Sequence, residues 1–333
     1  MLSHYPWQAA HWHNLQAAIG RDRIPHALLL VGGRGMGVAR FADALAAAIL
    51  CRQPSADGAC GQCQSCILFD AGNHPDLFRV EPEEEGKAIK VDAVRDLIAS
   101  IQLRSQYGRY KIAVINPAEA MNRSAANSLL KTLEEPPSSS LLLLVSRQPS
   151  LLPITIRSRC QRLDFVPRLD DENARWLAQR LGMAADKASD LLLLARGQPL
   201  DAVELAEGDT LEKQQALLQD IDLLCSRSAD PVSMARKWLD YGPVEVLVWL
   251  LGFVQAMVNL KLYGNAVTKG HSAINDGLHG IADQLDLRQL VDCYDLILKN
   301  YRAASGPFNL NQQGMLEEII VYWQSLNPMN IRS

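Results

Sequence analysis

The sequence has few aromatic residues and no excess of positive charge. Phe, Trp and Tyr make up 6% of its 333 residues, whereas 48% are hydrophobic and Leu and Ala are abundant, which favours helices. Its 33 Lys and Arg are outnumbered by 37 Asp and Glu, so the net charge is −4. Proteins that bind nucleic acid through their own electrostatic field are usually basic. The composition therefore disfavours strong autonomous binding to DNA or RNA, although it allows a local contact.

The sequence also lacks the marks of secretion and of a membrane anchor. It opens without the cationic residues and apolar run of a secretory signal. A membrane span needs ~20 mainly apolar residues with few charges. Polar residues interrupt the most hydrophobic stretch, 244–262, at four positions: Glu245, Gln255, Asn259 and Lys261. We therefore expect a buried helix there, in a soluble cytoplasmic protein without a membrane partner.

Short apolar runs alternate with helical patterns in the N-terminal half. Strand followed by helix followed by strand, with short apolar strands, is typical of a parallel sheet covered by helices. The patterns predict strands over Ala27–Val31, Lys111–Ile115, Ser140–Ser146 and Arg162–Val166. They predict helices over Val38–Leu50 and over Asn122–Glu135, where Pro136 and Pro137 stop the helix.

The pattern changes near Pro167, after which the helical period dominates. Helices are predicted over Asp171–Leu181 (with Asp170 as its N-cap), Lys187–Ala195 and Leu200–Glu207, and a longer helical block extends from about residue 210 to residue 323. The fold class expected is therefore α/β followed by all-α.

A glycine-rich turn joins the first predicted strand to the first long helix. Gly32 and Gly37 match the two ends of a phosphate-binding loop, GxxxxGK[ST]. The lysine that reaches the phosphates is replaced by Val38, and the hydroxyl residue that binds Mg²⁺ is replaced by Ala39. Backbone amides at the helix start still suit an anion, but tight binding of Mg·ATP is not expected. A glycine turn without function stays open as an alternative.

The second element of such an ATPase site has lost its acids as well. A strand ending in acidic residues normally holds the Mg²⁺ shell and the attacking water. The strand over Lys111–Ile115 ends in Asn116 and Pro117, neither of which is acidic. Two independent losses predict a chain that does not hydrolyse ATP and has no functional ATP site.

Four of the seven cysteines are clustered within sixteen residues: Cys51, Cys60, Cys63 and Cys66. Cys-x2-Cys spacing places two thiolates on one tight turn, at the separation that tetrahedral Zn²⁺ needs. Four sulfurs without a local histidine predict a closed structural zinc site. An iron–sulfur cluster is the main alternative, because three of the cysteines are spaced Cys-x2-Cys-x2-Cys. Free thiols are a third, weaker interpretation.

A series of motifs occurs in a fixed order along the chain: Ile24–Leu30, the glycine loop, the four cysteines, His74-Pro75-Asp76, Val91–Arg95, Ser128–Pro137 and Ser158-Arg159-Cys160. This series resembles a known family, the AAA+ clamp-loader subunits of bacterial DNA polymerase III. No single motif is specific, but the combination is. Beyond about residue 200 the resemblance is one of helical pattern alone.

Within that family the chain resembles the delta-prime subunits, which do not hydrolyse ATP. The motor subunits (gamma/tau) keep an intact phosphate loop and an acidic strand end. A sensor arginine of the family's lid would fall near Leu200, where this sequence has none. The resemblance implies that the chain is not an enzyme by itself. Its implied partners are motor subunits, the delta subunit, the sliding clamp (weakly) and primer–template DNA within the assembly.

The resemblance also implies a role for Ser158 and Arg159: the motif's arginine reaches ATP held by a neighbouring subunit. A planar cation near the γ-phosphate neutralises charge that develops in phosphoryl transfer, and supplying it in trans couples hydrolysis to docking. The alternative is an ordinary surface ion pair, since Arg157 and Arg162 lie close by.

The resemblance divides the chain into three domains: a RecA-like AAA+ core over 1–166 with the zinc module at about 51–66, a helical lid over 167–208, and a helical collar over 209–333. The expected function is that of a non-hydrolysing stator that supports ATP-dependent loading of the sliding clamp on primed DNA. Two alternatives remain: an autonomous ATPase with a divergent phosphate loop, and an iron–sulfur or redox protein that uses the cysteine cluster.

Overall fold

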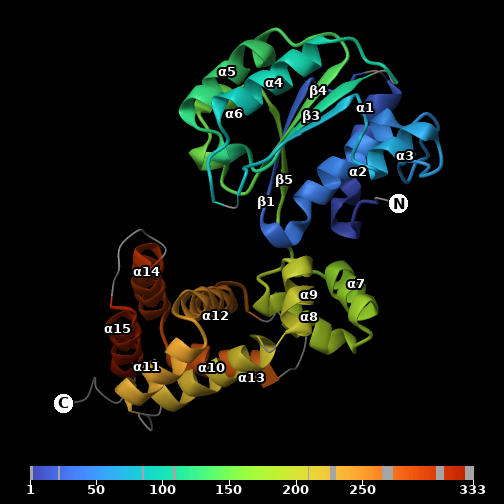
Figure 1. The fold of residues 1–333 in the computed structure, drawn as a ribbon. Helices are drawn as coiled ribbons and strands as arrows, with labels where there is room; N and C mark the ends of the chain where they lie inside the picture. Colours follow the sequence, from blue (N-terminus) through green and yellow to red (C-terminus); the bar gives the residue numbers. More distant parts are fainter. Residues whose placement is uncertain are drawn as a thin grey trace. The chain divides into compact units, whose positions relative to one another are not determined.

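In a computed structural model the chain forms two compact units, residues 1–167 and 168–333 (Figure 1). The structure describes residues 3–326 except 22, 85, 108–109, 209, 226–229, 265–272 and 305–310. The junction between the units falls where the sequence pattern changes, next to Pro167. The expected split of the second unit into lid and collar stays a prediction.

The first unit is built on a parallel sheet of five strands in the order β2-β3-β4-β1-β5. The strands are β1 (Ala27–Gly32), β2 (Leu77–Val80), β3 (Lys111–Ile115), β4 (Ser140–Ser146) and β5 (Gln161–Phe165). The four predicted strands are confirmed to within one residue at each end. The short strand β2 lies at one edge of the sheet and was not predicted.

Helices cover both faces of this sheet (Figure 1). Because side chains alternate along a strand, Leu28 and Leu30 enter one core with Phe41, whereas Leu29 and Val31 enter the other with Leu129. The α-helices are α1 (Ala9–Gly20), α2 (Val38–Leu50), α3 (Gln64–Asp70), α4 (Val91–Gln102), α5 (Arg123–Glu134) and α6 (Ile154–Arg157). Short 3₁₀ turns are η1 (Pro6–Gln8), η2 (Arg34–Met36), η3 (Ala118–Ala120) and η4 (Pro149–Leu151).

The second unit is helical in the residues that the structure describes. Helices α7 (Asp171–Leu181), α8 (Ala185–Leu194) and α9 (Pro199–Glu207) share one small core. As predicted, the Asp170 carboxylate caps α7 by accepting the Asn173 N–H at 2.9 Å. A larger core joins α10 (Thr210–Cys225), α11 (Pro231–Asp240), α12 (Pro243–Tyr263), α13 (Ala273–Gln284), α14 (Leu287–Ala304) and α15 (Gln312–Ser325).

Helix α12 is the most apolar helix of the larger core. Among the described residues it alone is long and apolar enough to cross a membrane by composition. Half of its most apolar stretch is buried, with Leu250 and Val254 fully enclosed. The prediction of a buried helix is therefore confirmed along this face of α12.

Candidate functional site

The glycine loop lies between β1 and α2, and Gly37 has the left-handed backbone (φ 67°) that this turn requires. The Val38 side chain is buried and lies against the end of β1. A Cβ placed on Gly32 would come within 2.7 Å of Val38 Cγ2 and 3.0 Å of Phe165 Cβ. Where an ATPase has a lysine at the phosphates, this chain thus has an apolar side chain that packs into the core, and Ala39 beside it is exposed.

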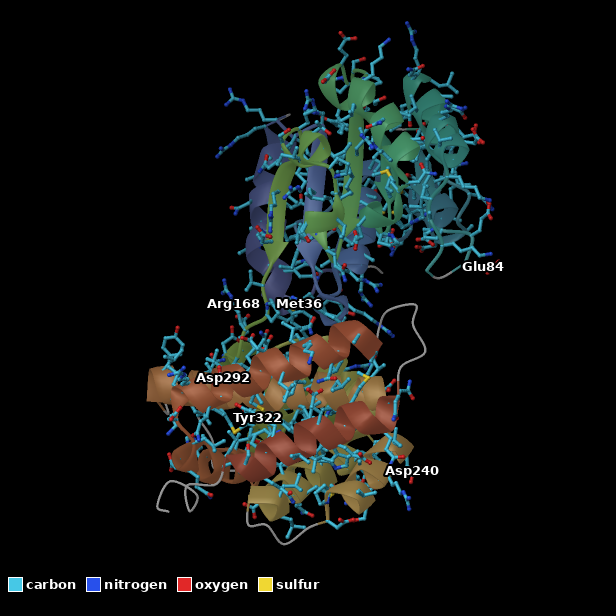
Figure 2. The ribbon with its side chains drawn as sticks, turned by 90° about the vertical axis from the view of Figure 1, so that its left-hand side faces the viewer. Met36, Glu84, Arg168, Asp240, Asp292 and Tyr322 are labelled. Carbon is cyan, nitrogen blue, oxygen red and sulfur yellow. The ribbon has the colours of Figure 1, made fainter. Side chains whose placement is uncertain are left out.

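The first residues of the chain hold the glycine loop in shape. The Gln8 amide is fully buried, and its Nε2 donates to the carbonyls of Met36 at 2.8 Å and of Gly37 at 3.1 Å. Trp7 Nε1 donates to the Met36 carbonyl as well, at 3.0 Å. Met36 is labelled in Figure 2, at the end of the first unit where β1 stops. The loop is therefore braced by the protein's own side chains, which the sequence did not reveal.

Asn116 and Pro117 lie at the end of β3 and offer no carboxylate there. The Asn116 N–H donates to the Val80 carbonyl at 3.0 Å. The acid that follows, Glu119, accepts the backbone N–H groups of Arg147 and Gln148 at 2.9 and 3.1 Å. One oxygen of this carboxylate therefore fastens the segment after β4.

The four clustered cysteines meet in space, as predicted. Their sulfur atoms all lie within 4.8 Å of one another, and three of the pairs are 3.5 to 3.9 Å apart. Tetrahedral coordination with metal–sulfur bonds of ~2.3 Å puts the sulfurs about 3.8 Å apart. Cys51, Cys60, Cys63 and Cys66 therefore match the ligand set of one tetrahedral metal ion. No other His, Cys, Asp or Glu of the described residues joins this group.

Backbone N–H groups of the cysteine turns point at the sulfurs. Cys51 Sγ accepts from Cys60 N and Gln53 N at 3.3 and 3.4 Å, and Cys60 Sγ accepts from Cys63 N at 3.4 Å. Burial works to raise the pKa of the Cys63 thiol, but backbone N–H groups and neighbouring thiols outweigh it and lower this pKa to about 6. At Cys60 and Cys63 the turns therefore favour the thiolate, which is the form that binds a metal, whereas burial raises the pKa of Cys51 and Cys66.

A buried chain of hydrogen bonds connects the cysteine module to the sheet through His74. The Asp76 N–H donates to His74 Nδ1 at 3.1 Å, so the ring carries its proton on Nε2, 2.8 Å from Ser65 Oγ. Ser65, next to Cys66, donates in turn to the Leu50 carbonyl at 2.6 Å.

The Asp76 carboxylate is the second part of this network. It accepts from Ser105 Oγ, Gln106 N and Tyr107 N at 2.7 to 3.1 Å. It also lies 3.5 Å from the buried ammonium group of Lys111. Burial works to raise the pKa of Asp76, yet these donors and Lys111 lower it. The His74-Pro75-Asp76 motif thus has a structural role that its residue types alone did not specify.

Acidification is expected to destabilise the fold through His74. Burial lowers the pKa of His74, with Lys111 acting in the same direction and Asp76 against it. The unfolded chain, with a histidine pKa of ~6.5, therefore binds a proton more readily than the folded chain. The contribution of His74 to the free energy of unfolding is fully present above pH ~6.5. It is lost as the pH decreases toward the pKa of the folded state, at up to ~1.4 kcal/mol per pH unit.

Urea unfolding of the metal-loaded chain between pH 7.5 and 5.5 measures this effect. His74→Gln is expected to reduce the pH dependence, leaving the contribution of His4, whose pKa burial and His13 also lower. His279→Gln, on α13 of the second unit, is expected to keep the full dependence. An equally steep slope in His74→Gln would show that another group titrates.

Arg159 and Ser158 lie apart from the cysteines, directly after α6. The Arg159 guanidinium donates from Nη2 to Glu134 Oε1 at 2.5 Å and from Nη1 to the Thr155 carbonyl at 3.0 Å. Exposed Ser158 lies 3.4 Å from Nη1. Within this chain alone, Arg159 is therefore in a surface ion pair, as the alternative interpretation expected. Sequence reasoning missed Glu134 as the partner, although it lies inside the Ser128–Pro137 motif.

The segment that carries Arg159 is apolar and exposed just before it. The side chains of Leu151 and Ile154 are 64% and 66% exposed. Cys160 packs against the core on the other side, and burial raises its pKa to about 11. The neighbouring Arg162 is engaged by Asp164, with Nε and Nη2 at 2.8 and 2.7 Å. Arg159 thus follows two exposed apolar side chains in the chain, those of Leu151 and Ile154.

Comparison with known proteins decides the family. Residues 7–168 match the family described as DNA polymerase III, delta subunit. The delta' subunit of DNA polymerase III from Pseudomonas aeruginosa is 35% identical over 327 residues, which are 98% of this chain and 99% of that protein. This chain belongs to the delta' family of DNA polymerase III subunits. The family resemblance expected from the sequence motifs is confirmed.

More distant relatives lie outside the delta' family. The tau subunit of Escherichia coli DNA polymerase III is 34% identical over 61% of this chain and 33% of its own length. The solved structure of a gamma-subunit-related protein from Thermotoga maritima covers 94% of this chain and 99% of its own. That alignment has 19% identity and a TM-score of 0.43.

Proposed function

We propose that this delta' chain is the stator of a clamp loader: it hydrolyses no ATP itself and presents Arg159 to ATP held by a neighbouring motor subunit. The observation that carries the proposal is the position of Arg159. It is a half-exposed guanidinium in the segment that also carries the exposed side chains of Leu151 and Ile154. An apolar surface next to a cation suits a protein interface that brings an anion with it.

Three features of the glycine loop support the absence of hydrolysis. Val38 is buried where a lysine would reach phosphate, Ala39 offers no hydroxyl, and Gln8 already ties the loop carbonyls. The bonds from Gln8 hold the loop in this shape without a nucleotide. Rigidity of this site is therefore part of the proposed stator role.

The geometry of the cysteines supports structural zinc over the iron–sulfur alternative. Sulfur pairs 3.5 to 3.9 Å apart enclose the volume of a single ion. A cluster of four irons between the same sulfurs would hold them farther apart. Bound Zn²⁺ would supply no chemistry here beyond cross-linking α2, the turns and α3.

The proposed role implies a cytoplasmic chain that works with motor subunits, a delta subunit, the sliding clamp and primer–template DNA. With a net charge of −4, the chain has no field of its own to hold DNA. Contact with DNA is therefore weak for this chain alone, and so is contact with the clamp.

The isolated chain is expected not to bind Mg·ATP with a dissociation constant below about 1 mM, because the two groups that select the phosphates and the metal are missing. Isothermal titration calorimetry measures this, with a purified motor subunit as the positive control. Micromolar binding, or ATP turnover lost on changing Gly37, would instead support the autonomous ATPase.

The trans role is tested by exchanging Arg159 for alanine in a complex reconstituted with motor and delta subunits, and following ATP turnover.

A further inference from the structure

We propose that Glu134 withholds Arg159 from the neighbouring nucleotide, so that the arginine engages ATP only when the phosphate displaces this carboxylate. Glu134 is thereby a positioning residue that sets how much ATP the adjacent site needs. The inference rests on the proposed function, since it assigns Arg159 to a neighbour's ATP.

The guanidinium is held at two points of its own subunit. Nη2 donates to Glu134 Oε1 at 2.5 Å, and Nη1 donates to the Thr155 carbonyl at 3.0 Å. Glu134 is the last residue of α5, and Thr155 lies in α6. Both anchors belong to the first unit, so the free chain satisfies the arginine without any partner.

The strength of this pair suits a contact that is exchanged. The side chains of Arg159 and Glu134 are 35% and 51% exposed, so solvent screens their attraction. A triphosphate carries more negative charge than one carboxylate and accepts the planar guanidinium at two oxygens. A neighbour that holds ATP therefore outcompetes Glu134, whereas a neighbour without nucleotide does not.

The carboxylate left behind has a nearby counter-charge. Lys131 lies three residues before Glu134 on α5, a spacing that puts both side chains on one helix face, and it is exposed. After Arg159 leaves, Glu134 can be neutralised by Lys131 and by solvent. The exchange therefore does not leave the Glu134 carboxylate as an unpaired buried charge.

The ion pair with Glu134 is expected to lower the apparent affinity of the adjacent site for ATP. When only a fraction of the arginine is free to engage, the half-saturating ATP concentration rises by the reciprocal of that fraction. Removing the charge of Glu134 frees the arginine. The expected change is about two- to five-fold, the range that exposed ion pairs give.

The test is ATP turnover, measured against ATP concentration, in complexes reconstituted with motor and delta subunits. Glu134→Gln keeps the shape of the side chain and loses its charge, and it is expected to lower the half-saturating ATP concentration about two- to five-fold. Glu135→Gln is the matched control, because Glu135 is the adjacent exposed acid and forms no ion pair with Arg159. It is expected to leave the half-saturating concentration unchanged.

A double-mutant cycle separates this role from a purely structural one. In the Arg159→Ala background, Glu134→Gln is expected to have no further effect. An unchanged or raised half-saturating concentration in Glu134→Gln, or an effect that persists without Arg159, would overturn the inference. If Arg159→Ala leaves ATP turnover unchanged, the proposed function itself is wrong. If Arg159→Ala lowers turnover but Glu134→Gln leaves the half-saturating ATP concentration unchanged, only the inference about Glu134 is wrong.

Discussion

Replacing Arg159 with alanine is expected to lower the DNA- and clamp-stimulated ATP turnover of the reconstituted complex by about ten-fold or more. Arginines supplied in trans to a γ-phosphate contribute effects of at least this size, because they neutralise charge that develops in the transition state. The change removes a half-exposed side chain whose contacts lie at the surface, with Glu134 of α5 and Thr155 of α6. We therefore expect the chain to fold and the complex to assemble, which gel filtration checks.

The matched control for this exchange is Arg162→Ala. Arg162 lies three residues farther on and is engaged by Asp164 within β5, so its loss removes the same charge without a proposed role. Arg159→Lys should recover only part of the rate, since an ammonium group lacks the planar fork. Equal turnover in Arg159→Ala and Arg162→Ala, with both complexes intact, would leave Arg159 as an ordinary ion-pair residue.

Removing the metal from the cysteine cluster is expected to have the largest effect on stability. Purified protein should be colourless and contain about one zinc ion per chain. Cys63→Ser should reduce the zinc content well below that value, because three thiolates and a hydroxyl bind Zn²⁺ far more weakly than four thiolates. In such modules the binding site exists only in the folded chain, so the free energy of metal binding stabilises the fold directly.

The loss should extend beyond the module itself. Ser65 and His74 join α3 to the residues that precede β2, so a disordered module leaves buried polar groups unpaired. We expect the melting temperature of the first unit to fall by roughly 6–12 °C, as a loss of about 3 kcal/mol gives in a unit of this size. Cys160→Ala, at a partly buried cysteine outside the cluster, should keep the zinc. A brown protein with visible absorbance would contradict the zinc assignment.

Three of the four strands that the sequence predicted, β1, β3 and β4, bury nearly every side chain, whereas β5, at the other edge of the sheet from β2, buries only Phe165. β3 and β4 are buried at every position, so a short apolar run identifies each of them. β2 was missed because it is only four residues long and has one buried residue, Val80, beside half-buried Leu77 and Phe78 and the charged Arg79. Its pattern resembles a loop until the partner strand is known.

The candidate site divides in the same way between local and distant contacts. The cysteine cluster could be predicted because its four ligands lie within sixteen residues, on turns whose spacing fixes their separation. The ion pair of Arg159 with Glu134 joins residues 25 apart, and the bonds from Gln8 to Met36 and Gly37 join residues 28 and 29 apart. Such pairs follow from the packing of helices and loops around the sheet, and no periodicity in one sequence encodes them.

The most direct test of the central claim is to map where an ATP analogue with a photoreactive group on its γ-phosphate attaches to this chain. In the assembled complex, the account predicts attachment near residues 154–160, dependent on ATP bound by the motor subunits, and none in the isolated chain. Attachment to the chain's own loop at residues 32–39, or none near Arg159 in an active complex, would contradict it.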